Sequence, residues 1–120
     1  MFIRRRGTSH QMMESYREDA KAKQRVIANL GSCTTVAEAK ELWQHHVAVL
    51  AADLAMWERH LQAGLAFEAQ FPVIPHAYKT PHGGFRKDGK RIIEREIARC
   101  QRRLAAEQAN LERIKAIDDA

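Results

Sequence analysis

The spacing of apolar and polar residues divides the chain at about Gly31. Before this residue, short apolar and basic segments are separated by turn-forming residues, which predicts strands over residues 1–6, 12–18 and 23–30. These strands can form an antiparallel meander, but three strands are stable only when one face is covered. We expect five side chains on the covered face: Met12, Tyr16, Val26, Ala28 and Leu30.

Two longer apolar stripes follow, with the alternating steps of three and four residues that are typical of coiled-coil helices. The first stripe consists of Trp43, Val47, Leu50, Leu54, Trp57 and Leu61. The second consists of Ile93, Ile97, Cys100, Leu104, Leu111 and Ile114, with Glu107 as a polar interruption. Thr35 and Glu38 have the spacing of a capping box. The Pro and Gly residues between positions 72 and 89 interrupt the helical pattern.

This order of elements predicts an α+β fold, in which a short three-stranded meander precedes a long antiparallel helical hairpin. We expect one domain over residues 1–120, with the meander at 1–31, helices at 34–66 and 91–117, and a basic loop rich in Pro and Gly at 67–90. If the two apolar stripes face only each other, Trp43 and Trp57 remain partly exposed. A homodimer that covers them is therefore expected.

The net charge of +5 is unevenly distributed along the chain. Residues 1–30 hold seven Lys and Arg against three Asp and Glu, and residues 71–90 hold four against one. The segment between them is acidic, and residues 91–120 are nearly balanced. An anionic partner would therefore meet the meander and the central loop, which indicates nucleic acid, with DNA favoured over RNA.

The candidate nucleic-acid contacts are the basic residues of these two segments: Arg4, Arg5, Arg6, Arg17, Lys21, Lys23, Arg25, Arg86, Lys87 and Lys90. For the loop, a phosphate site at a helix N-terminus and a solvated basic loop remain alternatives. A further basic run lies on the second helix: Arg91, Arg95, Arg99, Arg102 and Arg103. Acidic neighbours favour a salt-bridged, solvated face over a nucleic-acid contact for this run.

No catalytic constellation is visible, so we expect neither an enzyme nor a cofactor. The segment Gly84 to Arg91 has the G-x-x-x-x-G-K spacing of a phosphate loop, but Arg91 stands where that motif needs Ser or Thr. The histidines lack the spacing of a metal site. Cys33 at a helix start suggests either a lowered thiol pKa or, as we favour, a small residue at a strand–helix junction. Cys33 and Cys100 are expected to be free thiols, with one long-range disulfide as the alternative.

No apolar run approaches the roughly 20 residues that span a bilayer, and no apolar stretch follows the basic start, as a signal peptide would require. We expect a cytoplasmic protein without membrane contact.

The first 31 residues contain a set of spaced positions that form a pattern: Met1, Ile3, Arg4 and Arg5, then Glu14 to Arg17, then Lys21 or Lys23, Gln24 and Arg25, and finally Leu30 and Gly31. This pattern resembles the N-terminal segment of IS1634-type (IS4-related) DDE transposases. Asp19 and Ala20 replace the Gly-Gly turn of that family. Such transposases continue into an RNase H-like catalytic domain, which these 120 residues do not accommodate.

The resemblance implies a DNA-contacting accessory module from a mobile element, phage or plasmid, and no transposition activity. The leading hypothesis is a non-enzymatic nucleic-acid-binding protein. The alternative is a protein-interaction module, whose helical hairpin dimerises or binds to and inhibits a nucleic-acid-processing complex.

Overall fold

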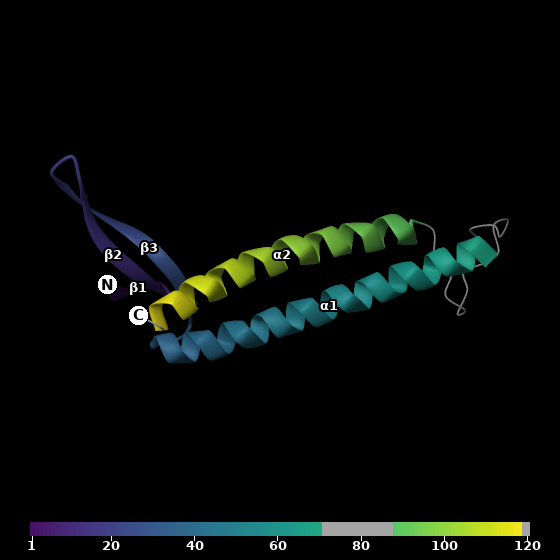
Figure 1. Ribbon diagram of the computed structural model, residues 1–120, viewed down its shortest axis with the longest axis horizontal. Helices are drawn as coiled ribbons and strands as arrows, with labels where there is room; N and C mark the ends of the chain where they lie inside the picture. The colour runs from purple at the N-terminus through teal and green to yellow at the C-terminus, as the bar shows by residue number, and fades with distance from the viewer. Residues whose placement is uncertain (71–87, 119–120) are drawn as a thin grey trace. The chain divides into compact units, whose positions relative to one another are not determined.

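The computed structural model describes residues 1–70 and 88–118, which form three strands followed by two helices (Figure 1). The elements are β1 (Phe2–Arg6), β2 (Ser9–Glu18), β3 (Lys21–Gly31), α1 (Val36–Gln70) and α2 (Gly89–Asp118). The predicted α+β class, a meander followed by a helical hairpin, is confirmed.

Helix α1 differs at both ends from the predicted range of 34–66. Thr35 is the capping residue, since its Oγ1 accepts a hydrogen bond from the Glu38 amide at 3.2 Å, and the helix therefore begins at Val36. The helix also passes through Gly64 and continues to Gln70. A single glycine costs only about 1 kcal/mol inside a helix, and the strong helix formers around Gly64 offset this cost.

The sheet has the order β1-β2-β3, and both pairs of neighbouring strands are antiparallel. Gly7, with φ of 64°, starts the turn between β1 and β2. Asp19 and Ala20 connect β2 to β3 with φ of 52° and 64°, as the two central residues of a type I′ hairpin turn require. The replacement of Gly-Gly by Asp19-Ala20 therefore keeps the left-handed backbone, although an alanine rarely adopts it.

One of the two irregularities in the pairing of β2 with β3 decides which face of the sheet Val26 occupies. Met12 pairs with Ala28 but Met13 pairs with Val26, so Ile27 is an extra residue in β3. This bulge places Val26 on the face opposite to Ala28, since a shift by one residue reverses the direction of a side chain. The prediction that Val26 belongs to the covered face is wrong, and its side chain is 48% exposed.

The described residues form two compact units. Unit 1 comprises Met1–Val47 and Ala105–Ala120, and it contains the sheet, the first turns of α1 and the end of α2. Unit 2 comprises Ala48–Leu104, with Leu50 and Cys100 among its buried side chains.

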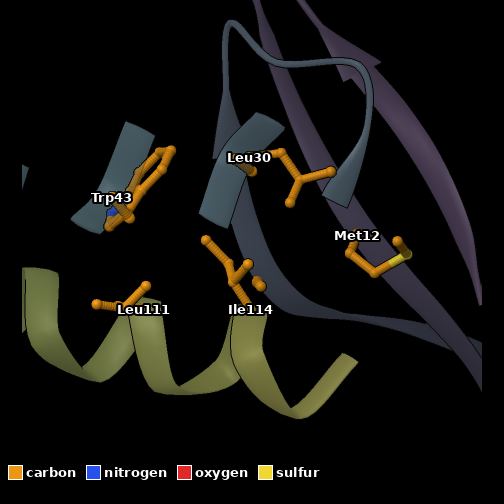
Figure 2. Close-up of a cluster of buried hydrophobic side chains, with 7 residues drawn as sticks. Met12, Leu30, Trp43, Leu111 and Ile114 are labelled. Carbon is orange, nitrogen blue, oxygen red and sulfur yellow. The ribbon is translucent and has the colours of Figure 1, made fainter. Parts of the chain in front are cut away.

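The core of unit 1 lies between the sheet and the two helix ends (Figure 2). Its buried members are Met12, Ala28, Leu30, Ala39, Trp43, Leu111 and Ile114. The Trp43 ring lies against the backbone of Gly31, where an added Cβ atom would come within 3.0 Å of it. Trp43 is only 5% exposed, so the expectation that it stays partly exposed until a dimer covers it is wrong.

A side-chain amide joins α2 to the free edge of β3. The Asn29 amide donates a hydrogen bond to Oδ1 of Asn110 at 2.9 Å, and Nδ2 of Asn110 donates to the Asn29 carbonyl at 2.8 Å. Asn110 therefore satisfies both outward backbone groups of Asn29 as a neighbouring strand would. This pair fixes the sheet to the end of α2.

Candidate nucleic-acid interface

The sheet has two faces of different chemistry, and both follow from the strand register. Residues directly opposite each other share a face, and successive residues of a strand alternate between faces. We call the face that includes Met12 and Ala28 the inner face, because these residues pack into the core. The outer face consists of Phe2, Arg4, Arg6, Ser9, Gln11, Met13, Ser15, Arg17, Ala22, Gln24, Val26 and Asn29.

Beyond β1, the sheet narrows to two strands. Strand β1 pairs only with Ser9 to Met13, so residues Glu14 to Arg25 form a two-stranded ribbon that ends in the Asp19-Ala20 turn. We call this segment, residues 14–25, the arm. A two-stranded ribbon is marginally stable by itself and depends on its cross-strand side-chain pairs.

The inner face of the arm contains those pairs. Arg25 forms an ion pair with Glu14 at 3.0 Å and lies over the Tyr16 ring, 5.0 Å from its centroid. Lys23 forms a second ion pair with Glu18 at 3.2 Å. Lys23 and Arg25, both predicted to bind nucleic acid, therefore have their charges partly neutralised within the arm.

The outer face carries arginines and neutral hydrogen-bonding groups, and it contains no carboxylate. Its cations are Arg4, Arg6 and Arg17. Arg4 is half-buried and donates to Oε1 of Gln11 at 2.8 Å, which fixes both side chains. Arg6 and Arg17 are exposed and form no ion pair or side-chain hydrogen bond in the part of the chain that the structure describes.

An apolar row crosses the middle of the outer face. Phe2, Met13 and Val26 lie directly opposite one another on the three strands. Met13, on the central strand, is 2% exposed, and its two neighbours are 39% and 48% exposed. This row separates the Arg4–Gln11 pair from the polar residues of the arm.

Two further predicted contacts lie elsewhere on the sheet. Arg5, whose Nε donates to the Gly7 carbonyl at 3.0 Å, is on the inner face and exposed. Lys21 is exposed beside the turn of the arm. The structure therefore brings all seven basic candidates of the meander onto one small sheet, but it distributes them over both faces.

The distribution of Lys and Arg along the sequence did not indicate the neutral residues of the outer face. Gln11, Ser15 and Gln24 stand beside the arginines in the register. The alternation of strand residues could have indicated them, because Ser15 and Arg17 are two residues apart in a predicted strand.

The other basic segments differ from the sheet. Arg86 and Lys87 lie outside the described residues, and Lys90 is exposed in the first turn of α2. Arg91 lies 4.0 Å from Asp88, and Arg99 lies 3.5 Å from Glu96, as expected of a salt-bridged face. The remaining arginines of this run are exposed: Arg95, Arg102 and Arg103.

The predicted helix-stripe residues are all buried or half-buried in the described helices. Trp43, Leu50 and Leu111 are buried, and the others are half-buried: Val47, Leu54, Trp57, Leu61, Ile93, Ile97 and Leu104. In unit 2, a shallow groove of about 600 Å³ is lined by Ala55, Glu58, Arg59, Leu61, Gln62, Ile97 and Gln101.

Cys33, for which a lowered thiol pKa was one of the two interpretations, has a raised pKa. Burial raises the pKa of the Cys33 thiol, the nearby Glu38 carboxylate raises it further, and a hydrogen bond with Ser32 opposes both. Cys33 is therefore not an activated thiolate, and it packs against the core beside Val36. Cys33 and Cys100 are both free thiols.

Within residues 1–70 and 88–118, no group of three His, Cys, Asp or Glu side chains could hold a metal ion. In the same part of the chain, neither helix contains a stretch that is long and apolar enough to cross a membrane.

Comparison with known protein families gives a match for the first half of the chain. The family model described as the N-terminal domain of IS1634 family transposases matches residues 3–62, which is half of the chain and includes the sheet and most of α1. The resemblance noted over residues 1–31 therefore extends into the helix, whose coiled-coil spacing is too common to indicate a family by itself. No curated protein and no solved structure matches the chain.

Proposed function

The chain belongs to the IS1634 transposase family, and we propose that it is a non-enzymatic, DNA-contacting module of a mobile element. The observation that carries this proposal is the outer face of the sheet, where three arginines lie among neutral polar groups without a carboxylate. A surface of this composition attracts a phosphate backbone, and no acidic side chain on it opposes the approach.

The ion pairs of the arm support the same proposal. Glu14 and Glu18, the acidic residues of β2, lie on the inner face and pair there with Arg25 and Lys23. These four residues stabilise the ribbon, and the cations of the outer face remain available. Within the described residues, Arg6 at the end of the outer face forms no ion pair, and neither do Arg5 and Lys21, which are exposed on the inner face. We assign the phosphate contacts chiefly to these three cations.

Two matched charge reversals test this assignment. Arg5→Glu with Arg6→Glu changes the sheet, and Arg102→Glu with Arg103→Glu makes the same change in net charge on α2. Binding to a mixed-sequence duplex is measured by fluorescence anisotropy at several salt concentrations. The sheet variant should lower the salt slope by about 2, since each lost phosphate contact removes about 0.9.

At moderate salt this loss corresponds to a decrease in affinity on the order of 10- to 100-fold. The α2 variant should bind nearly as the unchanged protein does. If the two variants lose affinity equally, the contact is not made by the sheet. If the unchanged protein binds no duplex DNA at low salt, or prefers RNA, the proposed function is wrong.

A second candidate function is self-association through α1, which is suggested by a separate apolar stripe. Val49 and Met56 are 44% and 36% exposed, and Ala52 lies between them at a spacing of three and four residues. Sedimentation velocity tests this candidate. Val49→Glu with Met56→Glu should shift a dimer to monomer, whereas Ala51→Glu, on another side of the same helix, should not.

A further inference from the structure

The arm has the width of a ribbon that fits the major groove of DNA. Its two strands lie about 4.8 Å apart, and the major groove of B-DNA is about 12 Å wide. The arm extends from the Glu14–Arg25 pair to the Glu18–Lys21 pair. At about 3.3 Å per residue it follows the groove for roughly four to five base pairs.

The outer face of the arm presents four side chains, each of which has a known partner on a base edge. Ser15 lies opposite Gln24, and Arg17 lies opposite Ala22. Arginine donates two hydrogen bonds to guanine O6 and N7, and glutamine pairs with adenine N6 and N7. Serine contacts either base, and the alanine methyl packs on the thymine methyl.

We propose that the arm lies in the major groove of duplex DNA with its outer face toward the base edges, where Arg17 and Gln24 read sequence. This inference rests on the proposed function and adds a mode of recognition to it. Arg17 and Gln24 are on different strands, two residue positions apart along the arm. The arm should therefore select a guanine and an adenine about two base pairs apart.

The opposite orientation of the arm is unfavourable. It would place Glu14 and Glu18 inside the groove between the two phosphate backbones, and Arg25 would have to leave both Glu14 and the Tyr16 ring to contact DNA. With the outer face in the groove, these contacts stay intact, and Lys21 remains beside the turn to contact phosphate.

A single-stranded ligand is disfavoured by the aromatic residues. Proteins that bind single strands stack successive bases on aromatic side chains. On the outer face, Phe2 is the aromatic residue, and it belongs to β1, outside the arm. Tyr16 is on the inner face beneath Arg25. A-form RNA duplexes are also excluded, because their major groove is too narrow to admit a ribbon.

Selection of bound duplexes from a randomised DNA pool tests the proposal with the full chain. The unchanged protein should enrich a short motif that contains the guanine and the adenine. Arg17→Met removes every hydrogen-bond donor of the side chain, so the preference for that guanine should fall roughly 5- to 150-fold. Gln24→Ala should relax the choice of adenine in the same way.

The matched control is Lys21→Ala, which removes a cation of the arm that does not face the bases. It should weaken binding to all sequences alike and lower the salt slope by about 1. Replacing the selected guanine by 7-deazaguanine, which lacks N7, should weaken binding of the unchanged protein and leave binding of Arg17→Met unaffected.

Several results would overturn the proposal. One is a bound pool without a motif, and another is a uniform loss of affinity in the Arg17 and Gln24 variants. In both cases DNA binding would stand and only base reading would be wrong. The proposal would also be contradicted if distamycin, which occupies the minor groove, abolished binding. A preference of the protein for RNA or single strands would contradict it as well. Circular dichroism checks that the substituted residues, all exposed, leave the fold intact.

Discussion

An alanine in place of Gly31 should destabilise unit 1 strongly, because two separate costs arise at this position. Gly31 has φ of 58°, a left-handed conformation that costs about 1–3 kcal/mol for a residue with a side chain. The added Cβ would also lie 3.0 Å and 3.2 Å from the Cη2 and Cζ3 atoms of Trp43. Overpacking of this kind costs about 1–3 kcal/mol, so we expect about 2–6 kcal/mol in total.

Gly7→Ala separates the two costs. Gly7 has a similar φ of 64°, but an added Cβ would have no atom within 4 Å, so only the backbone cost applies. Urea unfolding followed by circular dichroism gives the free energies of unfolding, and similar m values between variants show that the same transition is compared.

A double-mutant cycle with Trp43→Phe isolates the steric part. Phenylalanine lacks the outer ring atoms that the new methyl group would meet, so Gly31→Ala should cost less in this background, with a coupling energy of about 0.5–3 kcal/mol. If the two changes are additive, or Gly31→Ala costs no more than Gly7→Ala, the close contact between Gly31 and Trp43 is refuted.

Two further substitutions and one chemical modification test other features of unit 1. Asn110→Ala should cost about 1–3 kcal/mol and increase hydrogen exchange at the Asn29 amide, since it leaves backbone groups of β3 unpaired, whereas the exposed Gln108→Ala should change neither. If the Asn29 amide stays protected from exchange in the Asn110 variant, the two hydrogen bonds between Asn110 and Asn29 are contradicted. Ala20→Gly should stabilise the protein by about 0.5–1 kcal/mol by relieving the left-handed backbone, and Ala22→Gly, in β3, should instead destabilise it by a similar amount. Stabilisation by both or by neither would refute the strained turn. Iodoacetamide at neutral pH should alkylate Cys33 more slowly than a free cysteine, because its raised pKa lowers the thiolate fraction, and reaction at the same or a higher rate would show that the thiol is not shielded.

The spacing of apolar residues was sufficient to predict the order of the strands and helices. Steps of three and four residues indicated both helices, and Thr35 with Glu38 placed the start of α1 within two residues. The short basic segments before Gly31 indicated three strands in a meander. These features are local, because helix periodicity, capping and turn residues act over a few positions of the chain.

The local sequence pattern was not sufficient to predict which face of the sheet each side chain occupies. The extra residue at Ile27 reverses the side chains before it, so Val26 lies on the outer face although simple alternation with Ala28 places it inside. The division of cations between paired and free also depends on the register, which puts Glu14 opposite Arg25 and leaves Arg17 opposite Ala22.

The sequence by itself thus determined that the first third of the chain is basic, forms a meander and resembles a transposase N-terminal domain. Only the tertiary structure decided that Glu14 and Glu18 pair with cations on the inner face of the sheet and that the outer face has no carboxylate. The physical reason is that the net charge of a segment can be counted from its sequence, whereas a binding surface depends on which side chains the strand register places together.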